Sequence, residues 1–172
     1  VNKPSFQVII NSKTLLFPFK TFVNDNMQKW EFNTEILTDR VKTKSFKDFP
    51  ILPFKTNDNR TVLKYEFKKT NSDNHKRQFM LLSAIKNANI LKFLGGSIKG
   101  ELVTCIFEYF PDMAPLSNRI KDISDSPKTL TIIAYQIAEG FRFLHSNNII
   151  HGSLNLQSIL FRLPSQGIYT YI

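Results

Sequence analysis

Few residues of this chain could perform nucleophilic, acid–base or metal chemistry, and their spacing matches no hydrolytic or metal-binding pattern. Ser153 lies two residues after His151, but no G-x-S-x-G elbow surrounds it, so we do not expect a hydrolase nucleophile. His75 and His145 fall in separate segments without a Cys or carboxylate at ligand spacing. Cys105 is the only cysteine, which excludes a disulfide framework and a CxxC metal pair and favours a reducing compartment. The sequence therefore predicts no metal ion.

The chain has 172 residues, of which 42% are apolar, and it carries a formal net charge of +9. This composition predicts a packed globular fold with one domain or two small lobes. The first 100 residues carry a net charge of +10 and the remainder carry −1, so the basic surface belongs to the first half. Lys42, Lys44 and Lys47 form a possible interaction patch there, although a solvated edge is the simpler interpretation.

The longest apolar runs, such as TLLFPF and LVTCIFEYF, are too short to span a bilayer, and no signal peptide opens the chain. We therefore expect an intracellular, cytoplasmic protein, with cytoskeletal or nuclear association possible and no membrane partner. Because the chain begins at Val1 and ends in the apolar run GIYTYI, we expect both ends to be limits of a longer polypeptide.

The hydrophobic pattern predicts strands in the first part of the chain. Residues 1–40 contain the strand-like runs FQVII and TLLFPFKTF and form a leader of unclear fold. ILPFKT, a turn at Asn57-Asp58-Asn59 and RTVLKYEFKK predict a β-hairpin in which Leu63, Tyr65 and Phe67 share one face. A second hairpin is predicted around Lys99-Gly100.

Apolar residues recur at helical spacing in one segment between the two hairpins and in most of the chain after Pro111. A helix from His75 is predicted, with its N-cap at Asn71-Ser72-Asp73 and its end at Asn87-Ala88-Asn89. A short helix near 116–120 and a long one near 127–146 follow, the latter with a core stripe of Ile133, Ile137, Phe141 and Leu144. Strands followed by helices imply an α+β fold with two lobes.

The segment AYQIAEGFRFLHSNNIIHGSLNLQSILF resembles the last long helix, catalytic loop and following strand of eukaryotic protein kinases, whose loop reads H-R-D-L-x-x-x-N. NANILKFLGG is similar to the entry to the fourth kinase strand, and IFEYF resembles the gatekeeper and hinge at Phe107, Glu108 and Tyr109. These motifs are most similar to those of tyrosine-kinase-like and related Ser/Thr kinases. The resemblance implies a bilobal kinase-like fold: a β-rich small lobe with one main helix over 41–110, and a truncated helical lobe over 111–172 that ends near the expected DFG triplet.

The resemblance also shows which catalytic-loop groups this chain lacks. The loop begins at His151, for which a packing role is implied, and Gly152 replaces the arginine that pairs with a phosphorylated activation loop. Ser153 stands at the position of the aspartate that accepts the substrate proton. Asn155 replaces a lysine that contacts the γ-phosphate, and Ser158 replaces the asparagine that holds Mg²⁺.

The nucleotide-binding side departs from the kinase pattern as well. No glycine precedes Gly95, so the G-x-G-x-x-G-x-V loop is absent, and its glycine positions fall on the three lysines of the patch. Phe49 and Val62 would stand where smaller residues sandwich adenine.

Lys64 is the positional equivalent of the strand-three lysine, although a shift of two residues would place Glu66 there. Gln78 falls where the helix should supply a charged glutamate partner for that lysine.

These departures predict a catalytically inactive kinase-like domain, a pseudokinase without a cofactor, that binds proteins as a scaffold or as a structural component of a larger assembly. The alternative is a basic protein associated with an acidic surface, either nucleic acid or a filament such as the microtubule. An active divergent Ser/Thr protein kinase is a further reading, but Asp48, Glu108 and Asp112 do not fit the loop geometry.

Overall fold

The computed structural model describes residues 30–172 except 44–45, 47–48, 69–71 and 165–166. The described chain forms two compact units, which we treat separately. The β-rich unit runs from Trp30 to Lys86 and includes Lys92–Phe110. The helical unit contains Asn87–Leu91 and Pro111–Ile172. The expected strands of residues 1–22 lie outside the described residues, and the division at residue 40 stays a prediction.

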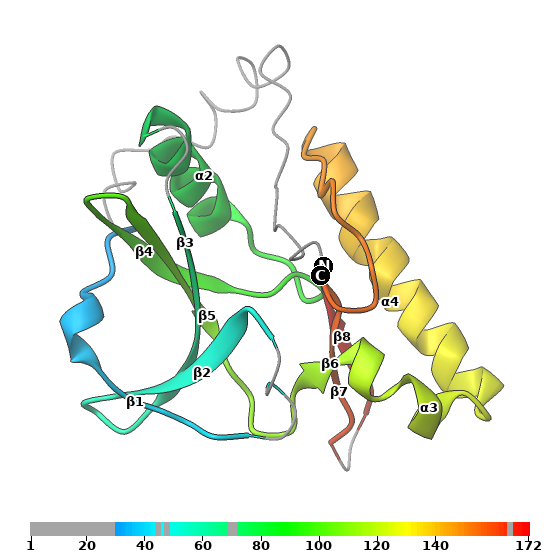
Figure 1. Cartoon of the computed structure of the whole chain (residues 1–172). Coiled ribbons are helices and arrows are strands. Elements are labelled where there is room, and N and C mark those ends of the chain that lie inside the picture. The colour runs from blue at the N-terminus through cyan, green and yellow to red at the C-terminus, as the bar shows by residue number, and fades with distance from the viewer. Residues whose placement is uncertain (1–29, 44–45, 47–48, 69–71, 165–166) are drawn as a thin grey trace. The chain divides into compact units, whose positions relative to one another are not determined.

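The β-rich unit is built on a five-stranded antiparallel sheet in the order β1-β2-β3-β5-β4 (Figure 1). A 3-10 helix, Thr34–Ile36, precedes the first strand. The strands are β1 Leu37–Arg40, β2 Ile51–Thr56, β3 Thr61–Lys68, β4 Phe93–Lys99 and β5 Leu102–Glu108. Helix α2, Ser72–Ala84, follows β3. Both predicted hairpins and the α+β class are confirmed, whereas β1 was not predicted because LTDR has a single apolar residue.

Helix α2 covers the face of the sheet that carries the predicted apolar stripe of β3. Tyr65 and Phe67 pack against the core formed by Phe79 of α2 with residues of β4 and β5. The members of that buried core are Phe79, Phe93, Val103 and Cys105. Because side chains alternate along a strand, Val62, Lys64 and Glu66 of β3 point to the opposite face.

Two adjacent glycines in β4 allow close packing on both sides of that strand. A Cβ on Gly96 would lie 2.6 Å from the Phe79 ring, and one on Gly95 would lie 2.8 Å from the Trp30 carbonyl. The segment after Trp30 runs along the edge of β4, where the Phe32 amide donates to the Gly96 carbonyl at 2.8 Å. The described end of the leader therefore belongs to the hydrophobic core of the β-rich unit.

The helical unit consists of short helices, the long helix α4 and a small sheet (Figure 1). Its elements are β6 Ala114–Pro115, the 3-10 helix Leu116–Asn118, α3 Ile120–Ile123, α4 Pro127–Ser146, β7 Leu160–Arg162 and β8 Tyr169–Tyr171. The three strands pair in the order β6-β7-β8. Helix α4 begins where Ser126 accepts a hydrogen bond from the Thr129 amide, and Pro127 occupies its first turn.

The core stripe predicted for α4 is confirmed in part. Ile133 and Leu144 are buried, whereas Ile137 and Phe141 are only half-buried. Gly140 brings the helix close to β8, because a Cβ there would lie 2.8 Å from the Ile172 side chain. The buried face of α4 is therefore narrower than the sequence pattern suggests.

Candidate functional site

The loop between α4 and β7 is held together by two side chains that bond each other's backbone. The Asn155 carboxamide oxygen accepts hydrogen bonds from the amides of Gln157 at 2.8 Å and Ser158 at 3.0 Å. In return, the Ser158 hydroxyl donates to the Asn155 carbonyl at 2.9 Å and accepts from the Asn155 amide at 3.0 Å. This arrangement closes a tight turn at the end of the loop.

The turn engages Asn155 and Ser158, the two residues that stand where kinases have a γ-phosphate contact and a metal ligand. Ser158 is 7% exposed, and its hydroxyl oxygen already takes part in two hydrogen bonds within the turn. A hydroxyl held in this way is a weak substitute for the oxygen ligands that Mg²⁺ prefers. Asn155 likewise supplies its side-chain oxygen to the turn rather than to a phosphate-binding role.

The first part of the loop is positioned by His151, which is buried against Phe141 with ring centroids 5.8 Å apart. Its Nδ1 accepts a hydrogen bond from the Ser153 amide at 3.4 Å. Burial lowers the pKa of the His151 imidazole, so the neutral ring that can accept this bond is favoured. Gly152 between them has φ +74°, a conformation that glycine adopts without a side-chain clash. The left-handed backbone conformation at position 152 therefore favours the glycine that the sequence has there.

The structure gives Lys64 a partner on its own strand rather than on α2. Its Nζ lies 3.0 Å from the Glu66 carboxylate and 4.5 Å from the centre of the Phe54 ring. Glu66 in turn accepts a hydrogen bond from the Thr104 hydroxyl at 3.1 Å. The positive charge of Lys64 is therefore neutralised on the sheet face that α2 does not cover.

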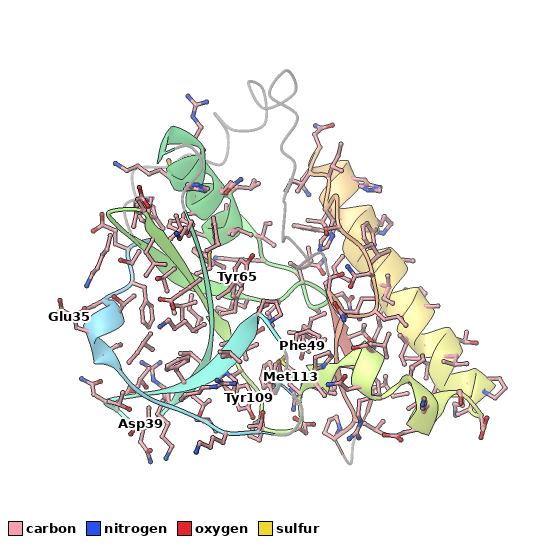
Figure 2. The ribbon with its side chains drawn as sticks, viewed as in Figure 1. Glu35, Asp39, Phe49, Tyr65, Tyr109 and Met113 are labelled. Atoms are coloured by element: carbon pink, nitrogen blue, oxygen red, sulfur yellow. The ribbon has the colours of Figure 1, made fainter. Side chains whose placement is uncertain are left out.

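Gln78, the expected helix partner, lies 3.2 Å from Nδ1 of His75 on its own helix. It is Tyr65, one residue after Lys64, that lies on the α2 face of β3 (Figure 2). Alternation along β3 places Lys64 and Val62 on the other face, and the assignment of Lys64 as the strand-three lysine stays a prediction. The same register pairs Val62 with Glu108 and Leu63 with Phe107.

The expected hinge segment joins the ends of β5 and β4. The Phe107 ring packs against Phe93 with centroids 5.6 Å apart. The Glu108 amide donates to the Lys92 carbonyl at 3.0 Å, and the Lys92 amide donates to the Glu108 carboxylate at 3.2 Å. These two hydrogen bonds join Glu108, at the end of β5, to Lys92, which directly precedes β4.

Aromatic rings meet where the connection between β1 and β2 approaches the segment after β5. Phe46 lies 6.2 Å from Phe49 and 6.3 Å from Tyr109, measured between ring centroids. The sequence reading assigned no role to Phe46, because a single phenylalanine among lysines carries no periodic signal. Of the proposed patch, Lys42 is exposed, whereas Lys44 and Lys47 lie outside the described residues.

The described residues contain no cluster of three or more histidine, cysteine or acidic side chains that could bind a metal ion. Burial raises the pKa of the Cys105 thiol to about 12, so its nucleophilic thiolate is strongly disfavoured. Within the same described part of the chain, no helix has the length and apolar character needed to cross a membrane.

Comparison with known proteins identifies the family. The sequence profile of the protein tyrosine and serine/threonine kinase family matches residues 55–166, well over half of the chain. The chain belongs to this family. Its sheet with α2 is consistent with a kinase small lobe, and the helical unit is consistent with the start of the helical lobe.

Among its relatives, the human dual specificity testis-specific protein kinase 1 is 27% identical over 111 residues, which cover 62% of this chain and 17% of that protein. The meiosis-specific serine/threonine-protein kinase mek1 of Schizosaccharomyces pombe is 29% identical over 96 residues, 55% of this chain and 21% of that protein. Mitogen-activated protein kinase kinase kinase A of Dictyostelium discoideum is 27% identical over 92 residues, 54% of this chain and 10% of that protein. The chain thus spans only about a fifth or less of the length of these relatives.

Proposed function

We propose that this chain is a non-catalytic member of the kinase family, a pseudokinase that acts through protein binding. The observation that carries the proposal is the catalytic loop, in which Ser153 and Ser158 stand at the positions of the proton acceptor and a metal ligand. Phosphoryl transfer depends on positioning the nucleophile and on neutralising charge with metal ions. A serine hydroxyl supplies neither a carboxylate base nor a strong Mg²⁺ ligand.

The contacts within the loop add support to this proposal. The Ser158 hydroxyl stabilises the turn with Asn155, so metal coordination by Ser158 would compete with those hydrogen bonds. Lys64 is ion-paired with Glu66, and alternation along β3 places it on the face opposite Tyr65 and Phe67. The contacts of Ser158 and Lys64 therefore both support the proposal of a non-catalytic domain.

Restoring one carboxylate tests whether the site is close to an active one. We expect that neither the wild-type chain nor Ser153→Asp transfers phosphate from Mg²⁺-ATP, because the metal and lysine contributions remain missing in both. Transfer of labelled phosphate to the chain itself or to a generic protein substrate is the measurement, with Tyr135→Phe on the exposed face of α4 as a folded control. Transfer by the wild type, or a gain on Ser153→Asp alone, would contradict the proposal.

A partner with an acidic surface is the interaction that the charges favour. Arg40, Lys42, Lys76 and Arg77 are exposed, and the described residues hold no ion-pair partner for any of them. By contrast, each arginine of the helical unit is paired with a carboxylate: Arg119 with Asp122, Arg142 with Glu139 and Arg162 with Asp112. The excess positive charge of the β-rich unit is thus available to steer an acidic partner.

Charge reversal at Lys42, Lys44 and Lys47 tests this interaction. We expect the triple change to Glu to weaken binding to a fluorescent polyglutamate peptide while the circular dichroism spectrum stays unchanged, because charge reversal in a lysine-rich segment alters association more than folding. Reversing Lys121 and Lys128, which are exposed on the helical unit, is the matched control. Equal binding by both variants would exclude the patch, and preferential binding to a short DNA duplex would favour nucleic acid instead.

A further inference from the structure

His75 is a buried polar residue near the start of α2. It is 6% exposed, and its ring meets Phe67 of β3 with centroids 5.3 Å apart and an interplanar angle of 70°. Phe67 packs against the core that Phe79 and Cys105 help to form. The contact between His75 and Phe67 therefore holds the first turns of α2 against β3.

The two ring nitrogen atoms of His75 have different surroundings. Nδ1 lies 3.2 Å from Oε1 of Gln78, three residues further along the helix. Because Oε1 can only accept a hydrogen bond, this contact requires a proton on Nδ1. Nε2 is buried and has no hydrogen-bond partner in the described part of the chain. The neutral ring, protonated on Nδ1, therefore leaves only one unpaired acceptor in the interior.

A second proton on this ring would be unfavourable in the folded structure. It would place an N–H donor at Nε2, where no acceptor is described, and would give the buried ring a positive charge. The Phe67 ring compensates such a charge only in part, since an aromatic contact is weaker than the hydration that a buried cation loses. Protonation of His75 therefore favours a conformation in which the ring reaches water.

The charged residues of α2 offer a protonated His75 no counterion. None of the residues three or four positions away, which share its face of the helix, is charged. Asp73 is two positions away, a spacing at which helical side chains do not face each other. The adjacent Lys76 and Arg77 are exposed and positive, so they oppose a further positive charge.

The sheet beneath the helix provides no counterion either. The titratable residues of the core are Tyr65 of β3 and Cys105 of β5, and both side chains are uncharged at neutral pH. The charged side chains of β3, β4 and β5 alternate to the opposite face, and Glu101 in the turn between β4 and β5 is exposed. Among the described residues, no carboxylate forms an ion pair with His75. A positive charge on His75 would therefore be stabilised by water alone.

We propose that His75 makes the packing of α2 sensitive to protons: the neutral ring holds the first turns of the helix against β3, and the protonated ring releases them. The open form binds one more proton than the closed form, so its population rises as the pH falls. Release would uncover the apolar core that contains Phe79 and Cys105. The inference goes beyond the proposed function, because it concerns a change of conformation rather than catalysis or the choice of partner.

The thiol of Cys105 measures this opening, because Cys105 is the only cysteine of the chain and is 6% exposed in the core beside Phe79. The reagent is dithiodipyridine, which reacts with thiols in mildly acid solution as well as at neutral pH. The labelling rate of the folded chain is divided by that of the chain unfolded in urea at the same pH, which removes the effect of pH on the thiol itself. We expect this ratio to rise about tenfold from about pH 7.5 to about pH 5.5, the range in which a solvated histidine takes up a proton.

The chain contains 3 histidines, so single substitutions show which of them controls the response. His75→Phe keeps a ring against Phe67 but cannot take up a proton, and its labelling ratio should change by less than about twofold over the same range. His145→Phe is the matched control, because His145 is exposed on α4, and it should respond like the wild type. The circular dichroism spectrum should stay native at both pH values, so that labelling reports a local opening.

A wild-type ratio that does not rise on acidification would contradict the inference, as would a rise that persists in His75→Phe. A response abolished by His151→Phe would assign the proton to the helical unit instead. Loss of the native spectrum at the lower pH would mean acid unfolding of the whole unit rather than release of α2. If His75→Phe does not fold, His75→Gln replaces it with the same expectation, and failure of both variants to fold would exclude a contact that can be released.

Discussion

Phe79→Ala should lower the free energy of unfolding of the β-rich unit by about 3–5 kcal/mol, the range for removing a buried phenylalanine ring. Phe79 is 1% exposed and lies between Trp30, 5.1 Å away, and Phe93, 5.5 Å away. Gly96 is adjacent to the same ring, so the surrounding backbone is already as close as it can come and cannot collapse into the cavity without moving β4. A loss of this size is comparable to the whole stability of a small domain.

Trp30 is the only tryptophan of the chain, so its fluorescence reports on the contact that the substitution removes. Urea unfolding followed by this signal measures the change in free energy. Lys76→Ala on the exposed face of α2 is the matched control and should lie within about 0.5 kcal/mol of the wild type. A Phe79→Ala variant as stable as this control would show that α2 does not pack through Phe79.

The pattern of the sequence predicts the elements of the fold well, because alternation and helical spacing are local properties. The two hairpins, α2 and the bounds of α4 all follow from such patterns. The face shared by Leu63, Tyr65 and Phe67 of β3 also follows from alternation, and the packing of Tyr65 and Phe67 against the Phe79 core confirms it. The assignment of Lys64 as the strand-three lysine came from the family motif rather than from alternation, and it stays a prediction.

Tertiary contacts explain what the sequence could not show. The room that Gly95 and Gly96 make for Trp30 and Phe79 depends on residues more than 10 positions away along the chain. Phe46 is another case, because a ring in a lysine-rich connection has no periodicity and its partner Tyr109 follows a different strand. Such residues can be recognised only when the segments they join are known.

The candidate catalytic loop could be predicted from the sequence only in part. Its departures at Ser153 and Ser158 are visible in the sequence once the loop is aligned with the kinase pattern. The reciprocal hydrogen bonds between Asn155 and Ser158 are not, since the same two residues could equally face a ligand. The structure adds that the side-chain oxygen atoms of Asn155 and Ser158 already stabilise the turn.

Leu144→Ala should destabilise the helical unit by about 2–5 kcal/mol, the range for truncating a buried leucine. Leu144 is 4% exposed near the C-terminal end of α4, and its carbonyl accepts from the Ile149 amide at 2.9 Å where the chain turns towards the loop. The lost side chain would leave a cavity in the core of the helical unit, because a residue this buried has few exposed atoms to lose. Urea unfolding followed by circular dichroism is the measurement.

Tyr135 on the same helix provides the matched comparison, because its side chain is 65% exposed. Tyr135→Ala removes a larger side chain than Leu144→Ala, yet it should change the free energy of unfolding by no more than about 0.5 kcal/mol, as surface substitutions usually do. If destabilisation followed the volume removed, Tyr135→Ala would be the more damaging change. That result, or equal stability of the two variants, would mean that α4 buries a different face from the one carrying Ile133 and Leu144.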